Sequence, residues 1–244
     1  MKSFYCLKTK VSATNLNDVC SFFIENIKDS KNRYICCANA HTTVTAYENE
    51  HYCNVLNNSY IVLPDGGPVA NKGIQHGNSN VKKVSGADFL EEMIKRSEGT
   101  NLKHFFYGNT NDNLDKFISY IKTNYPKLKI VGYEPSVFRE LSSKEETELK
   151  NRIKNSKADI VWVALGAPKQ EIFCAKLCED TNACFVAVGG AFNVMANIIP
   201  RAPKWMQDHS LEWFYRFIKE PKRLFKRYFV GNLKFIWYNL IYKG

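Results

Sequence analysis

The sequence has no run of about 18 apolar residues, so it predicts no transmembrane helix. Its first residues, Met1 to Tyr5, show neither the apolar core nor the small-residue cleavage site of a signal peptide. We therefore expect a cytoplasmic protein.

Familiar catalytic motifs are also missing. The sequence contains no G-x-S-x-G, H-E-x-x-H, G-x-x-x-x-G-K-[ST] or G-x-G-x-x-G, which argues against the corresponding hydrolase, zinc and nucleotide sites. It has no D-x-D pair, and its five histidines show no metal-ligand spacing. We therefore expect no metal and no cofactor.

The eight cysteines show no C-x-x-C pair. Cys36 and Cys37 are adjacent, and Cys174 and Cys178 lie four apart without a second pair at zinc-finger spacing. Free, buried thiols in a reducing compartment are expected.

The net charge of +10 is unevenly distributed. Residues 201–244 contain ten Lys or Arg and three Asp or Glu, so they contribute +7, and they hold 12 of the 33 aromatic residues. Such a segment suits an anionic surface, which could be membrane lipid, a pyrophosphate-linked substrate or nucleic acid. From Lys204 onward we expect two amphipathic helices, broken near Glu220-Pro221, which either pack on the body or face a membrane.

Short apolar segments alternate with helical patterns along the first 200 residues. The predicted strands are Tyr34–Ala38, Tyr60–Leu63, His104–Tyr107, Lys129–Tyr133, Ile160–Leu165 and Cys184–Val188. The predicted helices are Asn17–Lys28, Thr43–Leu56, Ala87–Ser97, Asn113–Asn124, Lys144–Asn155 and Lys169–Cys178, and Ser143 with Glu146 resembles a capping box. This order predicts an α/β fold, a Rossmann-like and mainly parallel sheet covered by helices. We divide the chain into a catalytic domain, 1–200, and a basic helical C-terminal appendage, 201–244.

Polar or glycine-rich segments follow five of the predicted strands. They contain Asn39, then Asp65-Gly66-Gly67, Gly108-Asn109, Gly166 to Glu171, and Gly189-Gly190 with Asn193. Ligands bind beyond the carboxyl ends of parallel strands, so these segments could form one crevice.

Asp65 is the sharpest catalytic candidate, because a base beside two glycines can be approached closely by a substrate hydroxyl. The alternative is a turn aspartate. Gly108-Asn109 or Gly189-Gly190 could hold a diphosphate through backbone N–H groups. Arg201, Arg216, Arg223 and Arg227 could stabilise an anionic leaving group, or they form a solvated helix face.

Several spaced blocks resemble the WecG/TagA/CpsF glycosyltransferases. Gly166 to Glu171 reads as G-x-P-x-Q-E, and Pro64-Asp65-Gly66 reads as P-D-G. Arg201-Ala202-Pro203, then Leu211-Glu212-Trp213 with Arg216, and then Pro221 with Arg223 are similar to the family's C-terminal run. The matches span roughly residues 34–232 in the family's order.

The resemblance implies an inverting transferase that takes a sugar, commonly of the N-acetylmannosamine type, from a UDP-sugar. The implied acceptor is an undecaprenyl-diphosphate-linked sugar. Such enzymes build teichoic acid linkage units, enterobacterial common antigen, capsules or exopolysaccharides. The implied location is the inner face of the cell membrane, with peripheral attachment to its anionic surface; a homo-oligomer is left open.

The resemblance also implies roles for residues. Asp65 takes the position of the base, and Asn39 and Gln170 those of donor-pocket residues, which we extend to Lys83, Gly108, Asn109, Gly189 and Asn193. Arg216 and Arg223 match arginines that close over the site and hold the diphosphate, and Lys226 or Arg227 is the third. We therefore expect residues 201–244 both to contact the membrane and to close the active site.

Three positions depart from the family pattern. Cys37 replaces a common Thr, Lys83 replaces an Arg, and Asn193 replaces an Asp. Lysine keeps the charge but loses the bidentate geometry of arginine. These changes leave the donor sugar undetermined.

Two other functions remain alternatives. A nucleic-acid-binding protein would use the basic aromatic segment, although no known module pattern is present. A catalytically impaired membrane scaffold would explain the departures, although Asp65 is retained. We expect UDP binding and no nucleic-acid partner.

Overall fold

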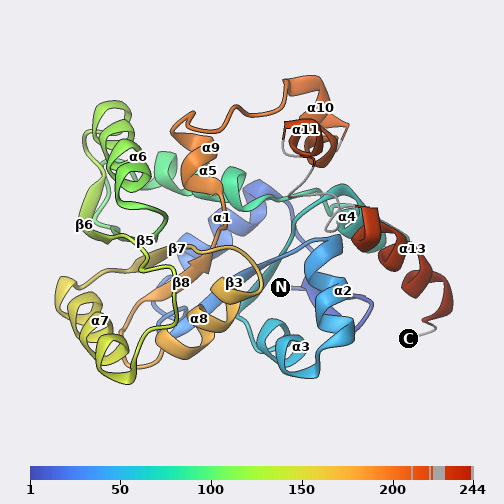
Figure 1. The fold of residues 1–244 in the computed structure, drawn as a ribbon, viewed down its shortest axis with the longest axis horizontal. Helices are drawn as coiled ribbons and strands as arrows, with labels where there is room; N and C mark the ends of the chain where they lie inside the picture. Colours follow the sequence, from blue (N-terminus) through green and yellow to red (C-terminus); the bar gives the residue numbers. More distant parts are fainter. Residues whose placement is uncertain (210, 220, 222–228, 243–244) are drawn as a thin grey trace.

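The computed structural model describes residues 1–209, 211–219, 221 and 229–242. Six parallel strands form the central sheet in the order β4-β3-β8-β7-β5-β6 (Figure 1). Their bounds are β3 (Arg33–Ala38), β4 (Ile61–Pro64), β5 (Lys103–Gly108), β6 (Lys129–Glu134), β7 (Ile160–Ala164) and β8 (Cys184–Ala187). The predicted α/β fold is therefore confirmed, and all six predicted strands are present.

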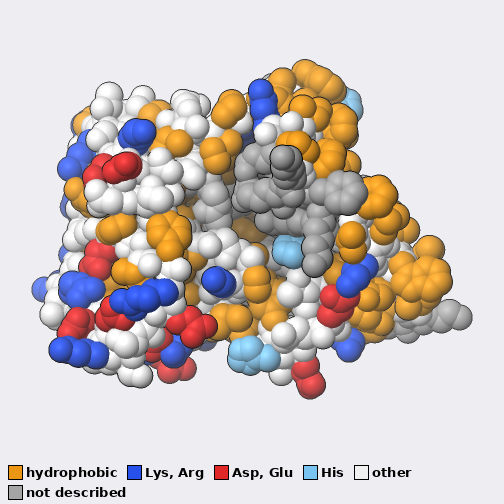
Figure 2. Space-filling model, viewed as in Figure 1, with side chains coloured by type: hydrophobic (Ala, Val, Ile, Leu, Met, Phe, Trp, Pro, Cys, Tyr) orange, Lys and Arg blue, Asp and Glu red, His pale blue; other side chains and the backbone are white. Residues whose placement is uncertain are grey.

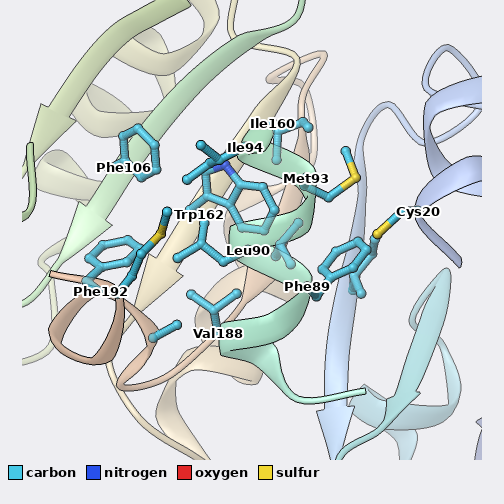
Figure 3. Close-up of a cluster of buried hydrophobic side chains, with 14 of the residues drawn as sticks. Cys20, Phe89, Leu90, Met93, Ile94, Phe106, Ile160, Trp162, Val188 and Phe192 are labelled. Atoms are coloured by element: carbon cyan, nitrogen blue, oxygen red, sulfur yellow. The ribbon is translucent and has the colours of Figure 1, made fainter. Parts of the chain in front are cut away.

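Helices cover both faces of this sheet. One face packs against α1 (Leu16–Glu25), α5 (Gly86–Ser97), α6 (Asn111–Asn124) and α9 (Ala191–Met195), around the buried rings of Trp162, Phe106 and Phe192 (Figure 3). The other face packs against α2 (Ala40–Glu48), α3 (Glu50–Asn57), α7 (Ser143–Ser156) and α8 (Lys169–Leu177). All eight cysteines are free and buried, as predicted.

Two local predictions are wrong. The helix expected over Thr43–Leu56 is two helices, because Asn49 adopts an extended conformation and its side chain caps α3 by accepting from the N–H of Tyr52. The capping box lies one residue earlier than predicted, where Ser142 and Glu145 bond reciprocally at the start of α7. Asn49 stands between apolar residues at helical spacing, and Ser142 and Ser143 are adjacent serines that could each cap α7.

Some elements were not predicted at all. A two-stranded antiparallel hairpin, β1 (Ser3–Cys6) and β2 (Thr9–Ser12), precedes the sheet, and α4 (Gly67–Gln75) follows β4. Both elements are short, and α4 contains Gly67 and Gly73, which lower its helix propensity.

The basic C-terminal segment contains α10 (Lys204–Asp208), α11 (Glu212–Lys219) and α13 (Gly231–Ile241). The first predicted amphipathic helix is thus divided into α10 and α11, and the predicted break at Glu220 lies outside the described residues. The helix α13 lies beside α2, where Lys234 and Tyr238 both contact the Glu48 carboxylate, at 2.6 and 2.7 Å (Figure 1). Within the described ranges, no helix combines the length and the apolar character needed to cross a membrane.

Candidate active site

The polar segments after the strands lie along one edge of the sheet. Every neighbouring pair in the six-stranded sheet is parallel, so all carboxyl ends point the same way. Asp65, Asn39, Gly189, Gly166 and Asn109 follow β4, β3, β8, β7 and β5, which are consecutive neighbours. The predicted crevice therefore has the right topology, since ligands of α/β sheets bind at this edge.

Asp65 is fixed by bonds to the neighbouring strand. Its N–H donates to the carbonyl of Ala38 at 2.8 Å, and its Oδ2 accepts from Asn39 Nδ2 at 3.1 Å. Gly66 then turns the chain into α4 with a φ of 112°, a value that favours glycine. The carboxylate is partly buried and remains at the end of its strand.

Asn39 is oriented by the helix that it caps. Its Oδ1 accepts from the N–H groups of His41 and Thr42, each at 3.1 Å, and the Thr42 hydroxyl accepts from the Asn39 N–H at 2.8 Å. Because the amide oxygen is committed to the helix α2, the amide nitrogen faces Asp65. A donor aimed at the candidate base stabilises its ionised form.

Gln170 lies between the loops that follow β7 and β8. Its Oε1 accepts from the N–H of Gly166 at 3.0 Å and from the N–H of Gly189 at 2.9 Å. Its Nε2 donates to Glu171 Oε1 at 2.8 Å, and Glu171 is fully buried. The N–H of Gly189, which was predicted to hold a diphosphate, is therefore bonded to Gln170 in this structure.

Asn109 and Asn193 form a hydrogen-bonded pair at the same edge of the sheet. Asn109 Nδ2 donates to Asn193 Oδ1 at 2.6 Å, which joins the loop after β5 to α9. Gly108 has a φ of 118°, and a Cβ on it would lie 2.5 Å from the carbonyl oxygen of Ala164. Two residues predicted to bind the donor are thus brought together, and Gly108 permits the close approach of β5 to β7.

Lys83 joins the C-terminal segment to the site. Its Nζ lies 2.5 Å from Glu212 Oε2 on α11 and 3.3 Å from the Gln207 carbonyl oxygen. The next residue, Val84, donates its N–H to the Pro64 carbonyl at 3.0 Å. The backbone of Lys83 therefore lies next to the end of β4, which Asp65 follows. The positive charge of Lys83 is therefore paired with the C-terminal segment.

Arg201 forms a second connection between the segment and the body. It contacts Asp88 on α5, lies 3.5 Å from Glu91 and lies 3.8 Å from Glu212. Burial opposes ionisation of Asp88, but hydrogen bonds from Ser85 and Arg201 outweigh it and lower the pKa of Asp88. Arg201, which was predicted as a possible stabiliser of the anionic leaving group, thus belongs to an ion-pair network.

Comparison with known proteins identifies the family. The family model described as "Glycosyl transferase WecG/TagA/CpsF family" matches residues 4–244. The chain belongs to this family. It is 30% identical over 212 residues, 86% of this chain and 81% of the relative, to the N-acetylglucosaminyldiphosphoundecaprenol N-acetyl-beta-D-mannosaminyltransferase of Bacillus subtilis (strain 168). It is also 29% identical over 198 residues, 81% of this chain and 75% of the relative, to the enzyme of that name from Bacillus spizizenii (strain ATCC 23059 / NRRL B-14472 / W23).

Membership confirms the resemblance drawn from the sequence blocks and shows that the chain is a glycosyltransferase. Of the three arginines assigned to the diphosphate, one lies among the described residues. Arg216 lies on α11, one helical turn after Glu212, whereas Arg223 and Arg227 fall outside the described residues. The assigned residue roles stay predictions.

Two residues of the matched blocks were not predicted as site residues. Glu171 contacts Gln170, and Glu212 contacts Lys83. Both glutamates stand inside the quoted blocks, Q-E and L-E-W, and this was the available signal. A charged side chain next to a site residue in such a block is a candidate for holding it in place.

Proposed function

We propose that the enzyme is an inverting glycosyltransferase that moves an N-acetylmannosamine-type sugar, or a related hexose, from a UDP-sugar to an undecaprenyl-diphosphate-linked sugar. The product would serve a bacterial surface polymer such as a teichoic acid linkage unit, a capsule or an exopolysaccharide. The main support is the pairing of Asp65 with Asn39 at the carboxyl edge of a sheet in a member of this family. The two Bacillus relatives are named for an undecaprenol-linked acceptor.

Asp65 acts as the general base in this proposal. The acceptor hydroxyl gives its proton to the carboxylate while its oxygen forms a bond to the anomeric carbon. The bond from that carbon to the diphosphate oxygen breaks on the opposite side, and UDP leaves with the electron pair. Asn39 holds the carboxylate through its amide nitrogen and stabilises its ionised form before the reaction.

The donor lies across the sheet edge in this proposal. Asp65 and Asn109 follow β4 and β5, which are four strand spacings apart, or about 19 Å at 4.8 Å per spacing. An extended nucleotide sugar has comparable length, so its sugar would lie by Asp65 and Asn39 and its nucleoside by Asn109 and Asn193. Gln170, Gly189 and Lys83 would lie around the diphosphate.

The charge of the departing UDP needs stabilisation. With no D-x-D pair in the sequence, we assign this role to Arg216, Arg223 and Arg227 rather than to a metal ion. Glu212 brings α11 to the body through Lys83, which places the Arg216 backbone one turn further along the same docked helix.

We also propose that α13 contacts an anionic membrane surface. Its residues 233, 236, 237, 240 and 241 form one helical face, and their side chains are half or more exposed. The opposite face packs on the body through Phe235 and through stacking of Tyr238 on Tyr47 at 4.5 Å. Figure 2 shows hydrophobic side chains gathered over α13 and over α10 and α11. A lipid-linked acceptor would be reached from such a surface.

The decisive experiment is a turnover assay with a panel of UDP-sugars and a lipid-diphosphate-sugar acceptor. We expect transfer by the wild type in EDTA, and we expect Asp65→Asn to keep UDP affinity while kcat falls roughly 10²–10⁴-fold. Asp29→Asn, an exposed substitution in the turn before β3 and so at the opposite edge of the sheet, is the control. Near wild-type turnover by Asp65→Asn would contradict the role of the base, and activity that requires added Mg²⁺ or Mn²⁺ would contradict metal independence.

A further inference from the structure

The amide of Gln170 bridges the two loops that follow β7 and β8, and we call this bridge the brace. Its oxygen accepts from Gly166 N–H at 3.0 Å and from Gly189 N–H at 2.9 Å, and these loops end the neighbouring strands β7 and β8. A carbonyl oxygen has two lone pairs, so these bonds use both of them. The oxygen of Gln170 therefore holds the protein backbone in place.

Glu171 determines the orientation of the Gln170 side-chain amide. Its Oε1 accepts from Gln170 Nε2 at 2.8 Å, and a rotation of the amide by 180° would face its NH₂ group with the N–H groups of both glycines. Gln170 is only 4% exposed and Glu171 is fully buried, so water does not readily replace these bonds. The acceptor on Glu171 thus selects the orientation in which the brace exists.

The surroundings of Glu171 are uncharged groups of the core. Burial, and next the Glu171 carboxylate, raise the pKa of the Tyr52 phenol on α3. Burial, and next the Glu171 carboxylate, raise the pKa of the Cys36 and Cys174 thiols well above the ordinary range. A carboxyl group placed among thiols and a phenol is costly to bury, which is unusual in a position serving packing alone.

We propose that Glu171 is a positioning residue for donor binding, and that it acts through Gln170 on the Gly166 and Gly189 loops rather than by touching the substrate. The inference rests on the proposed function, in which these loops lie around the diphosphate of the UDP-sugar. It also assigns Gln170 to the positioning of backbone, where the sequence comparison implied a direct donor contact.

The test exchanges the two side chains. In Gln170→Glu two carboxylates meet in a buried place, so we expect the brace to open, the Kd for UDP to rise and kcat/KM for the UDP-sugar to fall about 10²-fold. The KM for the acceptor should stay unchanged. In the double variant Gln170→Glu/Glu171→Gln, the carboxylate at 170 again accepts from both glycines and now also from the amide at 171. We expect this variant to recover most of the donor affinity.

The double variant separates the two roles of Gln170. It has no amide at position 170, so a direct amide contact with the donor would leave it as impaired as Gln170→Glu, and that result in a folded protein would overturn the proposal. Wild-type UDP affinity in Gln170→Glu would overturn it as well. Should Gln170→Glu not fold, Glu171→Leu and Glu171→Gln provide the same contrast: the leucine removes the acceptor and should weaken UDP binding, whereas the glutamine keeps it.

A second readout does not depend on the reaction. The amide ¹H–¹⁵N signals of Gly166 and Gly189 report their hydrogen bonds directly, and we expect both to shift in Gln170→Glu and to return in the double variant. Unshifted signals would refute the brace. A wild type that neither binds UDP nor transfers sugar, with both signals behaving as expected, would instead refute the proposed function alone.

Discussion

The ammonium group of Lys83 lies 2.5 Å from the carboxylate of Glu212, which is 129 residues further along the chain. This contact joins the residue beside the strand end of Asp65 to the basic C-terminal segment. Both side chains are about four-fifths buried, so the pair is shielded from solvent more than a surface ion pair. The pair therefore couples the docking of α11 on the body to the position of the Lys83 side chain.

We predict that Lys83→Gln and Glu212→Gln have non-additive effects on kcat/KM. Each substitution breaks the same contact, so the double variant should lose little more activity than either single variant. Lys176→Gln, which breaks the exposed Lys176–Glu146 pair of equal length, is the matched control and should leave transfer unchanged. Additive losses in a double-mutant cycle would mean that Lys83 acts on the substrate independently of α11.

The sequence predicted the sheet and the edge at which the site lies, because both follow from local patterns. Strand ends followed by Asn39 or Asp65 are visible in the order of residues, and parallel topology brings them together. The partners of these side chains were not predictable in the same way. The contact of Lys83 with Glu212 depends on how the C-terminal segment packs, and no pattern near either residue encodes it.

The helix boundaries show a similar limit at shorter range. Apolar residues before and after Asn49 recur at helical spacing, and this pattern alone favours one helix over Thr43–Leu56. The break becomes favourable because the Asn49 side chain satisfies the N–H of Tyr52 and allows α3 to pack Tyr52 and Leu56 into the core. Capping and tertiary packing together outweigh local helix propensity here.

Stability should depend on pH through His104. Burial lowers the pKa of His104 to about 3, and its Nδ1 accepts from Trp162 Nε1 at 3.0 Å. The unfolded chain binds a proton near pH 6.5 whereas the folded protein does not, so stability is complete above about pH 6.5 and is lost as the pH falls towards 3. The expected loss from this residue between pH 8 and pH 5 is about 2 kcal/mol.

Urea unfolding of His104→Gln tests this dependence. Glutamine keeps an acceptor for Trp162 but does not titrate, so the difference in unfolding free energy between pH 8 and pH 5 should shrink by about 2 kcal/mol. The exposed His51→Gln is the control and should retain the wild-type dependence. An unchanged pH dependence in His104→Gln would show that this imidazole is not kept neutral by the fold.

Phe138 should contribute to donor affinity. Its ring is 69% exposed although its φ of 55° is unfavourable for a residue with a side chain, and its loop is tied to the site by a bond from Ser136 N–H to the Asn109 carbonyl at 3.0 Å. An exposed aromatic ring on a loop bonded to Asn109 suits stacking on a nucleobase, worth about 1–3 kcal/mol. Phe138→Ala should raise the Kd for UDP at least several-fold, as measured by calorimetry. Tyr133→Ala on β6 is the control and should leave this Kd unchanged. Equal effects of the two substitutions would contradict a specific role for Phe138 in donor binding.

Membrane association should depend on the exposed face of α13. Trp237 and Leu240 are 60% and 71% exposed, so replacing both with Glu should not disturb the core, yet it places two negative charges where the helix would meet lipid. We expect Trp237→Glu/Leu240→Glu to bind vesicles containing phosphatidylglycerol at least ten times more weakly in a flotation assay. Ile74→Glu on α4, which is 49% exposed, is the matched control and should bind as the wild type does.

Transfer to a short-chain, water-soluble acceptor should persist in the double variant, because α13 is anchored to α2 through Lys234 and Glu48 on its other face. If vesicle binding is unchanged while the protein stays folded, the apolar stripe of α13 does not face the membrane, and the basic residues of the segment would have to provide the attraction alone.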